Sequence, residues 1–313
     1  MRGNTSQNSS PDGTNILQNR FVFKTVRYKS MDTSKIIMGL VFLSGLLLFG
    51  LWLLKTSLGR KALTDSMPRR NNMRPYLCLI PLFIWFVPVQ LAIQMTESLW
   101  SGLQDWQRAF LFNLIYCIGA TVVIAVIILL VRASFARRLK GFGLNKSSIH
   151  KDFFAAFVNL LSVWPLMMAA IALTIYLGQL IYGPQYEISQ HEQLELIKAY
   201  PQWQLRILIF VVAVIMAPVL EEMIFRGLFQ TVIRSVFESR NFKRKTRNRA
   251  WVAVFISSGF FSMVHGNVPH WPALFLLGLC LGYAYEKSGS LFRPIFIHAF
   301  FNAITIIFVL VEV

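Results

Sequence analysis

Eight apolar stretches occupy most of this 313-residue chain, and they restrict it to the helical membrane proteins. A helix needs about 20 apolar residues to cross the hydrocarbon core of a bilayer. The sixth and seventh stretches are shorter, so we expect them to be tilted, re-entrant or buried among the others. The stretches cover residues 36–54, 76–95, 109–131, 153–180, 205–228, 251–265, 271–285 and 292–311.

The composition leads to the same fold class. Hydrophobic residues make up 55% of the chain and charged residues 14%, whereas soluble proteins carry about 25% charged residues. A soluble enzyme and a disordered chain are therefore excluded, and continuous apolar runs argue against a β-barrel. We predict an all-α, polytopic bundle of about eight transmembrane helices over residues 36–313, preceded by a polar, basic tail at 1–35.

The basic residues cluster between the apolar stretches. The net charge of +17 would suit a nucleic-acid partner, but no aromatic and basic binding module stands out, so we predict none. The positive-inside rule places the basic connections in the cytoplasm, beside membrane lipids. We expect an integral, multi-pass protein, located in the plasma membrane if the chain is bacterial. The connections at 55–75, 132–152, 229–250 and 286–291, with Arg293, hold 21 of the 31 Lys and Arg residues.

Two adjacent carboxylates, Glu221 and Glu222, lie deep in the fifth apolar stretch. They are the only acidic residues expected at such depth, because all aspartates fall in the tail or the connections. An ionisable group inside a membrane costs at least about 2.5–3.5 kcal/mol, so the two need partners or a function. Glu222 can pair with Arg226 at spacing i,i+4. Glu221 points about 100° away around the helix, so its carboxylate is not paired with Arg226 and is a candidate catalytic group.

Three further polar residues lie in apolar surroundings. His265 ends the sixth stretch, while His298 and Asn302 share one face of the eighth. A lone histidine at an apolar helix end is usually a packing residue. Together with a buried glutamate, however, such a set can activate water, with Glu as general base, His as donor and Asn as oxyanion stabiliser. Glu221, His265 and His298 could instead hold a zinc ion, so the choice between no cofactor and zinc stays open.

Other protease signatures are incomplete. The sequence from His191 to Glu195 begins like a zincin motif but lacks the second histidine, and no GxSxG or pair of intramembrane aspartates occurs. Ser257, Ser258 and Ser262 lie near His265 and leave a serine mechanism formally open.

Two other features of the apolar stretches predict packing and not chemistry. Gly278 and Gly282 form a GxxxG pattern, which is typical of closely packed helices. Cys78, Cys117 and Cys280 share no metal-ligand spacing, and we interpret them as small core residues. His270 is assigned to a connection.

Three ordered motifs give residues 205–310 a family resemblance. The first is Glu221-Glu222-x-x-x-Arg226, the second Phe261-x-x-x-His265, and the third His298-x-x-x-Asn302. In order and internal spacing they resemble the motifs of the CPBP family, the CAAX prenyl proteases and bacteriocin-processing (Abi) membrane proteins. Residues 1–200 resemble nothing beyond membrane helices.

The resemblance implies an intramembrane peptidase of the glutamate or metallo type. It would cleave a membrane-associated or lipidated peptide or protein, prenylated in the eukaryotic relatives. The basic connections predict that the cavity opens toward the cytoplasm. Glu221 would be the base that activates water. The motifs would supply the rest of the site, with His265, His298 and Asn302 catalytic and Glu222, Arg226 and Phe261 supporting.

Two other functions are compatible with the same residues. A non-catalytic scaffold or bacteriocin-immunity protein could retain the motifs for packing. A transporter or proton relay also uses buried Glu and His, although such proteins usually show repeated halves, which this chain lacks.

The expected helix boundaries conflict with a shared site. Glu221 would lie about 24 Å along its helix from Leu205, and His265 about 21 Å along its helix from Trp251. Antiparallel helices would then place the two residues near opposite membrane faces. A common site requires tilt, a deeper start of the sixth helix, or broken helices.

Overall fold

The computed structural model describes residues 33–312 except 90, 93, 96–99, 101, 190–191 and 240–248. Most of the expected tail at 1–35 lies outside these residues. The described chain is helical, with one isolated β-bridge between Asn71 and Phe135. Its α-helices are α1 (Thr33–Lys55), α2 (Leu79–Ile84), α4 (Asp105–Ser134), α5 (Arg138–Phe142), α6 (Ile149–Tyr182), α7 (Glu192–Ala199), α8 (Trp203–Val211), α9 (Ala217–Glu222), α10 (Thr231–Ser239), α11 (Arg249–Met263), α12 (Trp271–Ser288) and α13 (Phe292–Glu312). Short 3₁₀ or π segments are η1 (Pro75–Cys78), η2 (Trp85–Val89), η3 (Lys146–Ser148), η4 (Val212–Met216), η5 (Met223–Gln230) and η7 (Val268–His270).

Five helical stretches of the described chain are long and apolar enough to span a membrane. Two further apolar helices are shorter, Pro75–Pro88 and Arg249–Met263. The predicted all-α, polytopic membrane bundle is thereby confirmed. The second and sixth of the expected apolar stretches form the short helices. The five long stretches are Lys35–Lys55, Asp105–Ser134, Lys146–Tyr182, Trp203–Glu238 and Phe292–Val311.

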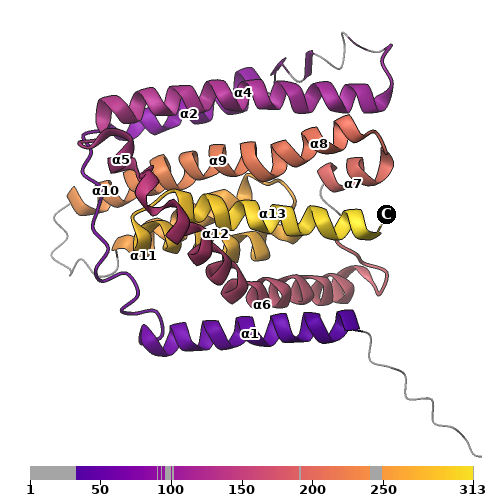
Figure 1. Ribbon diagram of the computed structural model, residues 1–313, viewed down its shortest axis with the longest axis horizontal. Coiled ribbons are helices and arrows are strands. Elements are labelled where there is room, and N and C mark those ends of the chain that lie inside the picture. Colours follow the sequence, from indigo (N-terminus) through magenta and orange to yellow (C-terminus); the bar gives the residue numbers. More distant parts are fainter. Residues whose placement is uncertain are drawn as a thin grey trace, which may run out of the picture.

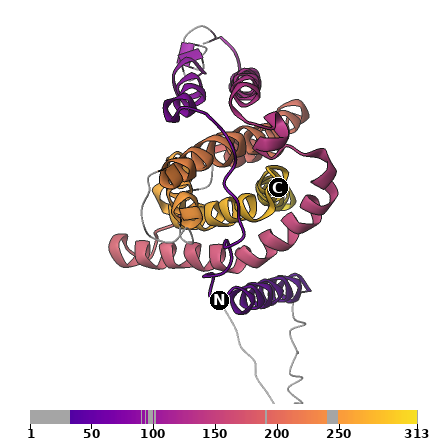
Figure 2. The ribbon, with the colours of Figure 1, turned by 90° about the vertical axis from the view of Figure 1, so that its left-hand side faces the viewer.

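The carboxyl-terminal helices form the centre of the bundle. The long span made of α8, η4, α9, η5 and α10 runs beside α13, with α4 on one side of this pair and α6 on the other (Figure 1). Viewed from the end, α1 lies outside α6, while α2 and α4 lie at the opposite edge (Figure 2). The motifs of the sequence therefore fall on the innermost helices.

Helix α1 is peripheral, with most of its large apolar side chains exposed. It packs mainly along α6, where a Cβ atom on Gly45 would come within 2.3 Å of the Leu161 carbonyl oxygen. Pro165 lacks the N–H that would bond to this carbonyl in a regular helix. The absence of a side chain at Gly45 thus lets the two helices touch at the interruption in α6.

The long span ends ten residues later than the sequence indicated, at Glu238 and not at residue 228. Arg234, which lies in the connection expected at 229–250, has a buried acidic partner in Glu286, so the helix continues past it. Glu221 consequently lies about midway, roughly 27 Å from Trp203 at 1.5 Å per residue. Because α11 has only 15 residues, it ends beside the middle of the span, and the boundary conflict disappears.

Two further carboxylates are buried, contrary to the expectation that Glu221 and Glu222 were the only deep ones. Asp152 is 1% exposed and lies 2.9 Å from an Arg293 guanidinium nitrogen. The Glu286 side chain is 6% exposed and forms an ion pair with Arg234. The sequence pattern places both in connections, but α6 and α12 include them and supply a basic partner from another part of the chain.

The GxxxG pattern packs as expected. A Cβ atom on Gly278 would lie 3.0 Å from the Ser258 Cβ atom, and one on Gly282 would lie 2.8 Å from the Gln230 side-chain oxygen. These glycines let α12 approach α11 and η5 closely, which places α11 against the motif helices.

Candidate active site

The two glutamates lie on a short α-helical segment between two π-helical segments. Helix α9 follows η4 and precedes η5, so the helix is locally widened on both sides of Glu221 and Glu222. Wide π turns inside α-helices occur frequently at functional sites. They change the direction in which the following side chains point.

The widened turn η4 leaves one backbone carbonyl without a partner in the helix. The Ala217 N–H bonds to the Val212 carbonyl, five residues back. In this register the next bond, to the Ala213 carbonyl, would come from residue 218, which is a proline and has no N–H. The Asn302 side-chain amide donates to the Ala213 carbonyl instead, at 2.7 Å. Asn302 therefore ties α13 to the turn just before the glutamates.

Glu221 faces His265. The Glu221 Oε2 and His265 Nε2 atoms are 3.6 Å apart, and the two side chains are 23% and 19% exposed. His265 Nδ1 lies 2.6 Å from the Phe261 carbonyl oxygen. This oxygen can only accept, so Nδ1 carries the proton and Nε2 is directed toward the carboxylate. Because α11 ends at Met263, His265 lies just beyond the end of this helix.

Glu222 faces His298 and Arg226. Its Oε1 atom lies 3.1 Å from His298 Nδ1, and its Oε2 atom lies 3.3 Å from Arg226 Nε. The Glu222 and Arg226 side chains have no exposed surface, and that of His298 is 5% exposed. The guanidinium group also donates to the Gly278 carbonyl at 3.5 Å. This second pair is sealed from solvent, whereas the Glu221–His265 pair is partly open.

Phe261 contacts three members of the site and has no exposed surface. Its ring centroid lies 4.7 Å from that of His265 and 5.6 Å from that of His298. The Arg226 guanidinium carbon lies 4.5 Å from the ring centroid, over its face. One phenyl ring thus positions both imidazoles and stabilises the buried cation.

The structure divides the expected cluster into two carboxylate–imidazole pairs. The motifs predict both histidines around Glu221, but His298 contacts the adjacent residue, Glu222. Consecutive side chains of a helix point about 100° apart, so Glu221 reaches the end of α11 while Glu222 reaches α13. Asn302, expected as an oxyanion donor, uses one amide N–H on the Ala213 carbonyl.

The proposed zinc ligands do not come together in this arrangement. Among the described residues, no group of three or more His, Cys, Asp and Glu side chains is placed to hold a metal ion. The set of Glu221, His265 and His298 therefore does not fit a zinc site here, and no chemical step below involves a metal.

The other candidates from the sequence take structural positions. The hydroxyl groups of Ser257, Ser258 and Ser262 donate to backbone carbonyl oxygens at 2.7–2.9 Å. Glu195 is exposed on α7, and His191 lies outside the described residues. His270 ends η7, outside the pairs just described.

Tyr116 is a neighbour of the site that the sequence analysis missed. It lies on α4, which packs against α9, and its ring packs edge-on against that of Trp85, with 4.7 Å between the ring centroids. A tyrosine in an apolar stretch carries no spacing signal, so only the packing of α4 against α9 reveals it.

The fold and site define a polytopic helical membrane protein whose carboxyl-terminal core holds two carboxylate–imidazole pairs beside a buried arginine. Residues 202–304 match the family described as type II CAAX prenyl endopeptidase Rce1-like. The match confirms the resemblance to the CPBP proteases, and it covers all three motifs.

A curated relative supports the same family. The chain is 29% identical over 114 residues to the candidate membrane peptidase YdiL of Bacillus subtilis (strain 168). The aligned part is 36% of this chain, and it spans 40% of the relative's length. No solved structure gives a significant match.

Proposed function

We propose that this protein is an intramembrane endopeptidase in which Glu221 and His265 activate a water molecule for peptide hydrolysis. The Glu221–His265 pair carries this proposal. Of the two carboxylate–imidazole pairs, it is the partly exposed one. Because Glu221 Oε2 and His265 Nε2 are 3.6 Å apart, one water molecule beside the pair can donate a hydrogen bond to each of them.

The reaction follows from the two functional groups. Water bound at the pair gives a proton to the Glu221 carboxylate while its oxygen attacks the carbonyl carbon of the scissile peptide bond. The tetrahedral intermediate collapses, the C–N bond breaks, and the proton passes from Glu221 to the leaving nitrogen. His265 Nε2 orients the water, since the bond of Nδ1 to the Phe261 carbonyl fixes the ring. The products are a carboxylic acid and an amine, which become a carboxylate and an ammonium group by proton transfer.

The second pair supports the first through the backbone of α9. Arg226 balances the charge of Glu222, and His298 and Gly278 complete the contacts of the ion pair. Fixing Glu222 fixes the adjacent residue, so the backbone of α9 holds Glu221 in place. In this proposal Glu222, Arg226, His298 and Asn302 are positioning residues.

The substrate we propose is a membrane-associated or lipidated peptide or protein. The matching family is described as a CAAX prenyl endopeptidase, which favours a prenylated substrate. A prenyl group would keep the substrate in the lipid while the peptide enters the polar site. We further propose that the site opens toward the cytoplasm, the side that the basic connections favour.

A comparison of protein termini tests the proposal and needs no defined substrate. Membrane fractions of cells that express the wild-type chain, Glu221→Gln or Glu195→Gln are analysed by mass spectrometry for new carboxyl and amino termini. Glu195 is an exposed glutamate on α7, so its variant controls for the chemical change itself.

We expect new termini with the wild type and with Glu195→Gln, and none with Glu221→Gln. Glutamine keeps the shape of the side chain but takes up no proton. Equal expression and thermal unfolding of the three proteins would show that only chemistry is lost. Undiminished cleavage by Glu221→Gln would exclude Glu221 as the general base. If no sample showed new termini, the non-catalytic scaffold would be favoured.

A further inference from the structure

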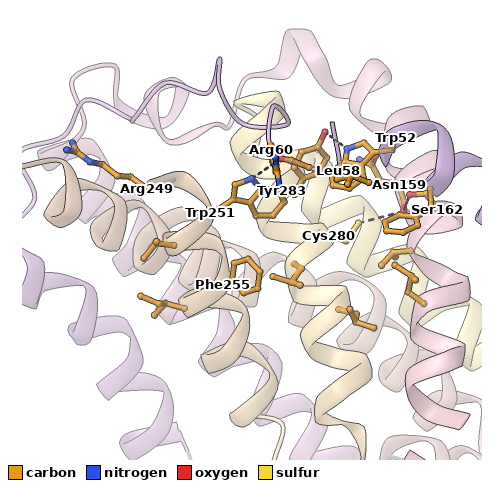
Figure 3. A pocket seen from close by; sticks show the side chains of 18 of the residues that line it. Trp52, Leu58, Arg60, Asn159, Ser162, Arg249, Trp251, Phe255, Cys280 and Tyr283 are labelled. Carbon is orange, nitrogen blue, oxygen red and sulfur yellow. Dashed lines mark hydrogen bonds between the residues drawn. The ribbon is translucent and has the colours of Figure 1, made fainter. Parts of the chain in front are cut away.

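A large cavity lies on the other side of α11 and α12 from the glutamates. Its volume is about 1420 Å³, and its walls come from α1, α6, α11, α12 and the turn at residues 58–60 (Figure 3). Pockets for small molecules usually measure about 300–1,000 Å³. The cavity is therefore large enough for a long, flexible occupant.

The cavity wall offers hydrocarbon and aromatic surfaces. Most of its polar groups already bond to one another or to the backbone. The Trp52 indole donates to the Tyr283 hydroxyl at 2.9 Å, and the Trp251 indole donates to the Gly59 carbonyl at 3.3 Å. The Ser162 hydroxyl donates to the Asn159 carbonyl at 2.8 Å. An occupant would meet chiefly C–H groups and ring faces, which suits acyl chains better than a peptide.

Arginine side chains provide positive charge at the cavity. Arg60 and Arg249 both belong to its lining. Arg60 is exposed and lies above the rings of Trp251 and Tyr283, whereas Arg249 points outward at the edge (Figure 3). A guanidinium group binds phosphate oxygens through two parallel hydrogen bonds. Positive charge at one end of an apolar cavity matches a ligand with an anionic head and a hydrocarbon tail.

The placement of α1 makes this cavity accessible from the bilayer. Helix α1 packs mainly along α6 and is tied to α12 by the Trp52–Tyr283 hydrogen bond. Its lipid-facing side chains are exposed. An acyl chain can therefore enter between α1 and α11 without the movement of a buried helix.

We propose that the cavity between α1, α6, α11 and α12 binds an anionic glycerophospholipid, with its phosphate at Arg60 and its acyl chains along the apolar side chains of α6, α11 and α12. This site is separate from the Glu221–His265 pair and does not depend on the proposed peptidase activity. A bound lipid would fill the space that α1 leaves open and would hold α1 to the core.

Native mass spectrometry of the full-length protein in detergent tests the proposal. The probes are dioleoyl phosphatidylglycerol and dioleoyl phosphatidylcholine, offered at equal concentration. The wild type should retain the anionic lipid preferentially. Arg60→Gln should reduce its retention about five-fold, since one basic side chain near a headgroup contributes about 1 kcal/mol. Arg132→Gln, which changes an exposed basic residue at the end of α4, should have no effect.

A filled cavity provides the second variant. Leu279→Trp places a large ring in the cavity and should abolish lipid retention while the protein still elutes as a folded species. Phosphatidylglycerol with brominated acyl chains should quench the fluorescence of wild-type Trp52 and Trp251 more than the brominated phosphatidylcholine does. This difference should vanish in Arg60→Gln.

Three results would overturn the proposal. The first is equal retention of the two lipids by the wild type, and the second is equal behaviour of Arg60→Gln and Arg132→Gln. The third is displacement of the lipid by millimolar inorganic phosphate alone, because it would reveal an anion site without a role for the acyl chains.

Discussion

The buried ion pair between Glu222 and Arg226 gives the strongest prediction about stability. Both side chains are fully buried, and their charged atoms lie 3.3 Å apart. In Arg226→Met, Glu222 keeps His298 as its polar partner among the residues that the structure describes. In Glu222→Gln, the guanidinium group keeps the Gly278 carbonyl at 3.5 Å and the Phe261 ring at 4.5 Å. Each single change therefore leaves one charge in the core without its counter-ion.

We expect each single variant to lose about 3–5 kcal/mol of folding free energy, the usual loss when one partner of a buried ion pair is removed. Glu222→Gln should fall at the lower end of this range, because the guanidinium group keeps its contacts with the Gly278 carbonyl and the Phe261 ring. The double variant removes both charges and should be more stable than either single one. The coupling free energy should then be at least about 3 kcal/mol.

Unfolding in mixed micelles provides the measurement. Sodium dodecyl sulfate is titrated into the protein in a mild detergent, and tryptophan fluorescence reports the fraction unfolded. Arg226→Met combined with Glu195→Gln is the matched control, because exposed Glu195 shares no contact with Arg226 and the two losses should add. Additive losses in the Glu222 and Arg226 double variant as well would refute the pairing.

Two further predictions concern the same core. Gly227→Ala should cost about 1–3 kcal/mol by overpacking, since its Cβ would lie 2.1 Å from the Phe142 ring. Phe142→Leu should reduce this cost in mixed-micelle unfolding. Gly259→Ala is the control and should leave stability unchanged, because its Cβ would meet nothing within 4 Å. Equal losses of folding free energy at the two glycines would contradict this packing. His265→Gln should remove peptidase activity and leave the thermal unfolding temperature unchanged, while His298→Gln, which loses the partner of a buried carboxylate, should lower both. If His265→Gln and His298→Gln changed the unfolding temperature equally, the two carboxylate–imidazole pairs would not differ in burial as described.

The sequence predicted the helices and the motif residues because their signals are local. Apolar length indicates a span, and the i,i+4 spacing indicates the pairing of Glu222 with Arg226. The buried Asp152 and Glu286 were missed because their partners are remote. Asp152 and Arg293 are 141 residues apart, and Glu286 and Arg234 are 52 residues apart. No local pattern distinguishes such a carboxylate from one in a connection.

The spacing of the motif residues could not predict the rotation of α9 about its own axis. Which imidazole meets which glutamate depends on the phase of α9, and two π-helical segments change that phase. Pro218 was the one visible signal, since a proline within a span frees a carbonyl that needs another donor. Its donor, Asn302, lies 89 residues away and could not be identified before the helices were packed.

The contact of Asn302 depends on the proline that follows the widened turn η4, and not on the extra residue in that turn. A π turn holds one residue more than an α-helical turn at the same axial position, so a chain that lacked one of residues 214–216 could close η4 as a regular turn. Ala213 would then lie four residues before the proline, and its carbonyl would still be the one that the proline leaves unbonded. Among homologous chains, asparagine at position 302 should therefore accompany proline at position 218, whatever the length of this segment. Pro218→Ala would supply an N–H donor to this carbonyl and should make Asn302→Leu tolerable, whereas a one-residue deletion in η4 should not.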